Sequence, residues 1–544
     1  MKARPRHVGR GAATLLALVP LLLAQSGAAT SSNPPSKDTS LWWEHIEVLA
    51  SDDFQGRLTG SAGYRKAAVY VADAMRRFGL VAAGDEGYFQ RVRYEVQTVL
   101  PERSAVSLTH RQGSEALSVG DDLVLGAGAL QPASVSGPLV FAGYGIHLPE
   151  AGYDDFVGLP LKGAIVVVLV GGPAVLSGAQ RAHAYAEVLP RFLESAGAVG
   201  LISITAPKNR EVPWERIKAA SVQPGMLLEE VTLRRYQGPM FTARFNDAFA
   251  DKLFRDCGRS FGELTALADA HRALPRFALN QSLKAQVATT RSHATADNVV
   301  GELPGSDAGL ASQAIVLSAH LDHLGTGTPD HGDGIFHGAM DNASGVASLL
   351  EVARALHESG RRPRRSVLFV AVGGEEKGLL GSRYFAAHPT RHAGTIVADI
   401  NMDMFLPLYP LTRIVGYGAE ESTLGDDARA VCAQIGVQLV TDPAPDHLVF
   451  VRSDQYNFIR RGIPALMPAI SPRPGTAEAQ TQTAWFSNRY HAQADDLGQP
   501  VDLAAAEAFN GFLLKLITRV AEAPDRPQWH STSFFARFSA NPLP

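Results

Sequence analysis

The chain has 544 residues, of which 46% are hydrophobic and 19% are charged, and its formal net charge is −4. This composition indicates a folded globular protein, and the length is that of two or three domains. The mildly acidic balance argues against a nucleic-acid-binding protein. The chain contains only 2 cysteines, which excludes a fold built on a disulfide framework.

Residues 1–28 have the pattern of a secretory signal peptide. Basic residues open the chain, residues 12–24 are mostly apolar, and Ser26, Gly27 and Ala28 provide small residues at a cleavage site. The apolar run is shorter than the roughly 20 residues that a membrane-spanning helix needs. We therefore predict a protein that is secreted or periplasmic and that has no membrane span.

The stretch from residue 29 to residue 95 is predicted to begin a catalytic domain with two helices, over residues 41–50 and 64–78. Gly79 follows the second helix as a favourable C-terminal stop. Apolar residues recur in the second helix at the spacing that places them on one face; they are Ala67, Ala68, Val71, Ala72 and Met75.

Residues 96–283 have a different character, with short β-like runs separated by turns that contain Gly and Pro. The runs at 165–170 and 200–204 are examples. Short apolar, β-branched runs bounded by turn residues are typical of strands. We interpret this stretch as a β-rich insertion, and residues 284–544 as the remainder of the catalytic domain.

Three apolar runs in the second half of the chain each lead into residues that can bind metals. In open α/β sheets, ligands bind at the carboxyl ends of the strands. A fourth candidate, Asp341, directly precedes a helix predicted over residues 343–357 from the spacing of its apolar residues. The runs and the polar residues that follow them are 315–319 with His320 and Asp322, 367–372 with Glu375 and Glu376, and 396–400 with Asp403.

The residue types at these positions suit zinc, which imidazole and carboxylate groups bind well. A carboxylate has two oxygens and can bridge two metal ions about 3.5–4 Å apart. A metal-bound imidazole usually needs a partner on its second nitrogen, and Asp322, two residues after His320, is the natural candidate. In the pair Glu375 and Glu376, one carboxylate can bind metal while the other acts on the attacking water.

Three motifs in this region resemble the zinc-dependent exopeptidases of family M28: HLDH at 320–323, MDNASG at 340–345 and GGEEKGLLGS at 373–382. Two later pieces, at 401–404 and 490–491, fit the same family order. The resemblance implies an α/β fold with an open, mostly parallel sheet flanked by helices. It also implies two Zn²⁺ ions, with His320 and Asp403 on one, Glu376 and His491 on the other, Asp341 as the bridge and Glu375 as the general base.

The same resemblance implies a cis peptide bond between Asp341 and Asn342 and places Asp454 beside the metals. One departure from the family pattern is Met340, where many relatives carry an acidic residue; the bridging position is unaffected. The polar loop at 325–338 also contains candidate ligands, but the ligand set is complete without them. We interpret them as loop residues: Asp330, His331, Asp333 and His337.

Residues 96–283 resemble a protease-associated domain in three segments, at 140–145, 154–156 and 163–168. In family M28 such domains are inserted into the catalytic domain and carry no catalytic residues. The insertion is interpreted either as a wall or lid over the substrate cleft or as a packing module, and the sequence leaves both readings open.

The sequence therefore predicts a secreted di-zinc exopeptidase that acts on peptides with a free terminus. An aminopeptidase is favoured because no basic pocket for a terminal carboxylate is evident. A carboxypeptidase or dipeptidase with the same metals is the first alternative. A glutaminyl-cyclase-like transferase would use one metal, and an inactive binding protein would lack an intact ligand set. The oligomeric state cannot be predicted from the sequence.

Overall fold

The computed structural model describes residues 37–543, apart from 211, 330–331, 391–393, 445–446 and 448; for residues 37–40 it describes the backbone alone. The predicted signal peptide and the loop residues Asp330 and His331 therefore lie outside the described residues. Among the described residues, no helix combines the length and the apolar content needed to cross a bilayer.

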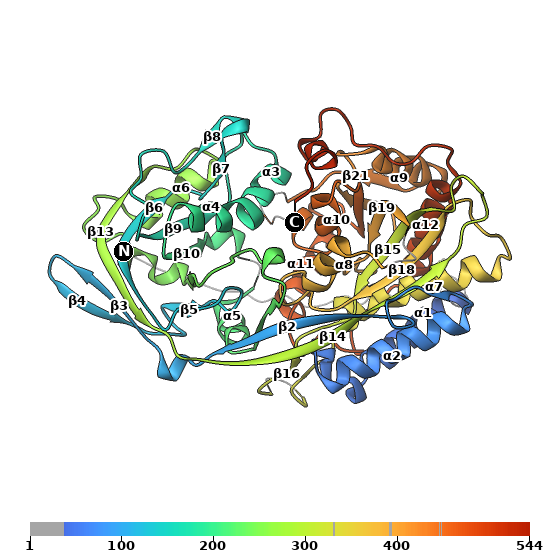
Figure 1. Ribbon diagram of the computed structural model, residues 1–544, viewed down its shortest axis with the longest axis horizontal. Helices are drawn as coiled ribbons and strands as arrows, with labels where there is room; N and C mark the ends of the chain where they lie inside the picture. Colours follow the sequence, from blue (N-terminus) through green and yellow to red (C-terminus); the bar gives the residue numbers. More distant parts are fainter. Residues whose placement is uncertain are drawn as a thin grey trace, which may run out of the picture. The chain divides into compact units, whose positions relative to one another are not determined.

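The larger of the two main sheets contains ten strands and is mixed (Figure 1). Its centre is parallel, with β15 lying between β18 and β19, and β22 next to β19. Antiparallel strands flank this centre on both sides. In sheet order the strands are β11 (Gly225–Leu228), β2 (Phe89–Val99), β14 (Thr289–Leu303), β18 (Ser366–Val372), β15 (Gln313–His320), β19 (Thr395–Asn401), β22 (Ala465–Ile470), β20 (Arg413–Tyr417) and β21 (Gln438–Val440), with β1 (Val81–Ala82) paired to β14.

Helices cover both faces of this sheet, because its central strands are apolar on both sides. Side chains alternate across a strand, so Ile315 and Leu317 of β15 contribute to one hydrophobic core while Val316 contributes to another. The first core includes residues of α1 (Lys37–Leu49), α2 (Ala62–Arg77), α7 (Ser344–Glu358) and α12 (Leu503–Glu522). The second includes residues of α8 (Leu380–Ala387) and α10 (Gln455–Arg460). The α/β class expected from the sequence is confirmed.

A second sheet of eight strands is built from the residues between β2 and β14, which we call the inserted segment (residues 100–288). Its core is separate from those of the large sheet. In sheet order its strands are β4 (Gly113–Leu117), β3 (Ala105–His110), β13 (Arg276–Gln286), β6 (Ser134–Ala142), β9 (Ile165–Val170), β10 (Gly200–Thr205), β12 (Phe241–Phe245) and β5 (Leu123–Leu125). The inserted segment also contains α3 (Gly178–His183), α4 (Leu189–Ser195), α5 (Trp214–Ser221) and α6 (Phe261–Asp269).

Two features stand out among those that join the inserted segment to the rest of the chain, which also include the pairing of β11 with β2. The long strands β2 and β14 pair with each other from Val99 opposite Thr289 to Phe89 opposite Val299. A buried ion-pair network forms the second join. Glu187 of the inserted segment contacts Arg383 of α8, and its Oε2 lies 3.0 Å from Nη2 of Arg460 in α10. The side chains of all three are 2% exposed.

Candidate metal centre

The predicted ligands follow the carboxyl ends of adjacent strands. His320 is the last residue of β15, and it lies in register with Val372, the last residue of the parallel strand β18. β19, parallel to β15 on its other side, ends two residues before Asp403. The parallel direction places these three ends at one edge of the sheet, where ligands bind in open α/β folds.

Two groups of imidazole and carboxylate atoms meet at this edge. In the first, His320 Nε2 lies 3.2 Å from Asp403 Oδ1 and 3.3 Å from Asp341 Oδ1. In the second, His491 Nε2 lies 3.3 Å from Asp341 Oδ2 and 3.3 Å from Glu376 Oε2. The two oxygens of Asp341 therefore face different groups, as a bridging carboxylate would.

These separations fit metal ligands. Donor atoms bound to one tetrahedral ion at about 2.0–2.1 Å lie about 3.3–3.4 Å from each other, and all four distances are 3.2–3.3 Å. Asp341 Oδ2 is buried and accepts no hydrogen bond within the described part of the chain. Burying several carboxylates together is costly unless cations offset their charge. The residues present thus fit metal binding at this edge, where donor atoms of His320, Asp341 and Asp403 form one converging group and those of His323, Asp341 and Glu376 form another.

The backbone around Asp341 is held by Asp495. The two oxygens of that carboxylate accept the N–H groups of Met340 and Asp341, each at 3.0 Å. The bond between Asp341 and Asn342 is cis, as predicted, and Asn342 Nδ2 donates to the carbonyl oxygen of Met402 at 2.9 Å. Burial alone would raise the pKa of the Asp341 carboxyl, but the facing imidazoles, led by His323, hold that pKa well below its usual value.

Asp322 contacts a different partner from the one we expected. Its Oδ1 lies 4.0 Å from His320 Nδ1, and its backbone carbonyl oxygen lies closer to that nitrogen, at 3.1 Å. The carboxylate instead accepts the N–H of Glu375 at 3.1 Å and of Glu376 at 3.3 Å, and the hydroxyl of Thr59 at 2.7 Å. Asp322 therefore fixes the turn that carries the two glutamates.

Glu375 lies on this turn with its residue half-buried. Removal from water raises the pKa of Glu375 well above its usual value; His320 opposes this effect, and the carboxylates of Glu376 and Asp403 add to it. Asp454, expected beside the site, is fully buried, and burial raises its pKa to about 7. Both carboxyl groups therefore favour a bound proton more than an exposed carboxyl does.

Sequence reasoning missed His323, the second histidine of the HLDH motif. It is fully buried, and its Nδ1 lies 2.8 Å from Glu376 Oε1 and 3.8 Å from Asp341 Oδ2. The shorter distance is that of a charge-assisted hydrogen bond, unlike the 3.3 Å that separates the ligand-like pairs. His323 thus orients Glu376 through Oε1, while His491 lies beside Oε2 of the same carboxylate. Its place three residues after His320, at the same strand end, was the available signal.

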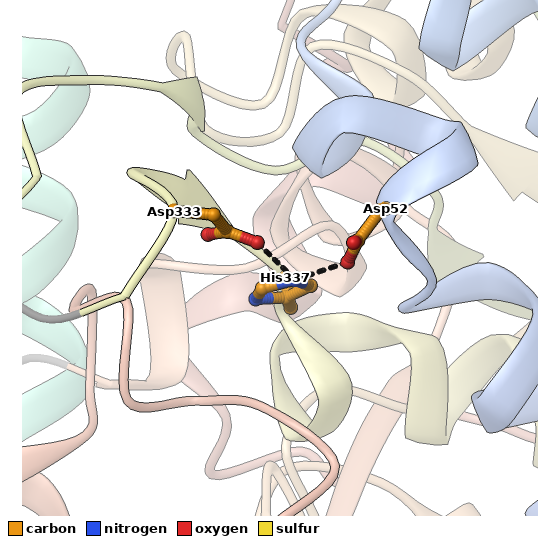
Figure 2. A group of neighbouring side chains, drawn as sticks. All are labelled: Asp52, Asp333 and His337. Carbon is orange, nitrogen blue, oxygen red and sulfur yellow. Dashed lines mark hydrogen bonds and ion pairs between the residues drawn. The ribbon is translucent and has the colours of Figure 1, made fainter.

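Another group of possible ligands lies on the surface (Figure 2). His337 Nε2 is 3.1 Å from Oδ1 of Asp52, in the short helix η1 (Asp52–Arg57), and 3.7 Å from Oδ2 of Asp333. The side chains of Asp52 and Asp333 are 79% and 45% exposed. Water solvates both carboxylates, so an ordinary surface contact accounts for this group, and we keep the interpretation of Asp333 and His337 as loop residues.

Comparison with known proteins agrees with the motif resemblance. The model for peptidase family M28 matches residues 298–517, the stretch that contains all the ligand-like residues above. This part of the chain is a family M28 peptidase domain.

Relatives of the M28 domain include leupeptin-inactivating enzyme 1 of Streptomyces exfoliatus, which is 29% identical over 224 residues. That match covers 40% of this chain and 46% of the relative. A protein named "Probable zinc metalloprotease" from Pyrenophora teres f. teres is 35% identical over 106 residues, which cover 20% of this chain and 22% of that protein. The chain thus matches less than half the length of each of these two relatives.

The fold extends beyond the M28 domain. An aminopeptidase from Aneurinibacillus sp. strain AM-1 superposes with a TM-score of 0.52 at 17% identity, over 90% of this chain and 95% of that one. The two chains therefore share their fold across the M28 domain and most of the remaining chain.

Proposed function

We propose that this protein is a di-zinc exopeptidase, and specifically an aminopeptidase that removes N-terminal residues from peptides. The observation that carries the proposal is the pair of imidazole–carboxylate groups that share Asp341. His320 and Asp403 would hold one zinc ion, Glu376 and His491 the other, and Asp341 would bridge them. The family match and the name of the Pyrenophora relative support zinc as the metal.

The chemistry follows from the residues around this bridge. When bound, the ions supply the Lewis acidity that activates a water molecule and polarises the scissile carbonyl. The Glu375 carboxylate takes a proton from the attacking water and later delivers it to the nitrogen of the leaving amine. Asp322 keeps Glu375 in place by accepting its backbone N–H, and His323 fixes the orientation of Glu376.

Substrates would be peptides with a free amino terminus, which metal and carboxylate groups can hold. One observation favours a second candidate, a carboxypeptidase. Arg452 is exposed, and its Nη2 lies 3.3 Å from the hydroxyl of Tyr490, the residue before His491. A guanidinium group at this position is a candidate partner for a terminal carboxylate.

The pattern of residues 1–28 supports the proposal that the protein is exported, either to the periplasm or out of the cell. Export would bring the enzyme to peptides outside the cytoplasm. Its N-terminal sequence after secretion, determined by mass spectrometry, would test this; an intact residue 1 on the exported protein would contradict cleavage at the small residues near position 28.

The test of function is digestion of a peptide mixture by the zinc-loaded protein, with half of the peptides acetylated at the amino terminus. We expect ladders shortened from the amino end, absent from the acetylated peptides and absent with Glu375→Gln. Shortening from the carboxyl end would favour the second candidate, and Arg452→Ala should then abolish it. No cleavage of either set would contradict the proposed activity.

A further inference from the structure

The inserted segment reaches the chain that carries His491. Nη1 of Arg216, in α5, donates to the backbone carbonyl oxygen of Tyr490 at 2.9 Å, and its Nη2 donates to the carbonyl oxygen of Ser487. Ser487 lies near the end of α11 (Ala477–Asn488), and His491 follows three residues after that helix. One guanidinium group therefore binds two backbone carbonyl oxygens just before His491, a proposed metal ligand.

Arg216 is itself fixed within the inserted segment. The indole nitrogen of Trp214 donates to the carbonyl oxygen of Gly120 at 2.8 Å, and Trp214 is buried. Lys218 Nζ lies 2.6 Å from Asp121 Oδ1. These contacts join α5 to the residues before β5, so the position of the guanidinium is set by the fold of the inserted segment.

The carbonyl that Arg216 holds belongs to the peptide unit joining Tyr490 to His491. His491 has a φ of 53°, in the left-handed region. For a residue other than glycine this conformation is strained and persists only where neighbouring groups impose it. Rotation about the backbone bonds of Tyr490 would displace this carbonyl together with the His491 Cα and carry the imidazole away from Asp341 and Glu376.

We propose that Arg216 is a positioning residue for the second metal ion, so that the inserted segment, which supplies no ligand, helps to build the metal centre. This inference rests on the proposed function, because it takes His491 as a ligand. It assigns the insertion a role beyond packing. The affinity for the ion held by His320 and Asp403 should depend on Arg216 much less than the affinity for the ion held by Glu376 and His491.

The experiment measures zinc binding to the full chain over a series of buffered free-zinc concentrations. Removing a partner that orients a ligand typically weakens metal binding 10–100-fold. For Arg216→Ala we expect the affinity for one of the two bound zinc equivalents to fall at least tenfold. The affinity for the other equivalent should stay unchanged. Arg216→Lys keeps the charge but cannot donate to two carbonyl oxygens in the same bidentate geometry. It should therefore weaken binding of the same zinc equivalent, but by a smaller factor.

Arg210→Ala is the matched control. Arg210 is another arginine of the inserted segment, and its Nη1 lies 2.9 Å from Oδ1 of Asp247, also in that segment. We expect the Arg210→Ala protein to bind both equivalents of zinc with wild-type affinity. Amide hydrogen exchange in metal-free protein provides a second readout. The exchange rate of peptides covering residues 485–495 should rise at least tenfold in Arg216→Ala and stay unchanged in Arg210→Ala.

The outcomes separate the two proposals. Two equivalents bound by Arg216→Ala with wild-type affinities, or unchanged exchange over residues 485–495, would overturn the role of Arg216. Wild-type protein that binds no zinc would instead contradict the proposed function, while the exchange readout would still report on Arg216. If Arg216→Ala does not fold, Arg216→Lys decides the question in both assays.

Discussion

Glu187→Gln should destabilise the fold, because it removes a buried carboxylate that pairs with Arg383 and Arg460. Burial raises the pKa of Glu187, but Arg383 and Arg460 outweigh this effect and lower the pKa to about 2, from a usual value of 4.5. Burial lowers the pKa of Arg383 to about 9, so that guanidinium stays charged at neutral pH. The glutamine variant would remove the counter-charge that Glu187 provides to both arginines.

The size of the effect follows from the pKa of Glu187 in the folded state. One pKa unit corresponds to about 1.4 kcal/mol, so the ionised group contributes about 3 kcal/mol to the free energy of unfolding. Breaking a buried pair by removing one partner typically costs 3–5 kcal/mol. Because the folded pKa is depressed, this stability is complete above about pH 4.5 and is lost as the pH falls towards 2.

Urea unfolding at pH 7.5 and at pH 3.5 measures the prediction. Glu187→Gln should lose about 3 kcal/mol at pH 7.5 and clearly less at pH 3.5. The control is Glu150→Gln, since Glu150 of the inserted segment pairs with Arg537 at 2.8 Å with both side chains at least 40% exposed. It should change stability by less than about 1 kcal/mol. A loss below about 1 kcal/mol for Glu187→Gln, or a loss equal at both pH values, would refute this reasoning.

Three further changes test the metal centre. Glu375→Gln should lower kcat by about 10²-fold or more while zinc content stays at the wild-type level; a parallel loss of zinc would make Glu375 a ligand instead. His323→Leu should weaken zinc binding about 10–100-fold, and His323→Asn, whose amide can still donate to Glu376, should recover part of that loss in the same titration. Removal of metal with a chelator should abolish peptide cleavage, and zinc should restore it; activity that persists in metal-free protein, verified by elemental analysis, would contradict the mechanism.

The strands and helices that carry the site were predictable because their sequence signals are local. Apolar β-branched runs ended in polar residues, and β15, β18 and β19 lie where these runs predicted them. The helix predicted after Asp341 is α7, displaced by one residue. The ligand-like residues also meet as expected, since parallel strands bring their carboxyl ends to one edge.

The contacts that orient these residues could not be predicted, because they depend on how distant turns pack. The spacing of His320 and Asp322 suggested a direct contact between their side chains. The structure turns the Asp322 carboxylate towards the N–H groups of Glu375 and Glu376, more than fifty residues later. Spacing alone likewise gives no sign that Asp495 holds the backbone of Asp341. Such partners are set by tertiary structure.

The pairing of β2 with β14 has a consequence for movement. Two strands that are hydrogen-bonded to each other along eleven residue pairs form a ribbon, not a pair of independent linkers. A ribbon bends easily across its face and resists stretching and shear in its own plane, because shear would break the ladder of hydrogen bonds. Rocking about this ribbon is thus the movement of the inserted segment that the ladder permits, and such rocking would have to break the Glu187 network and release Arg216 from the chain that carries His491.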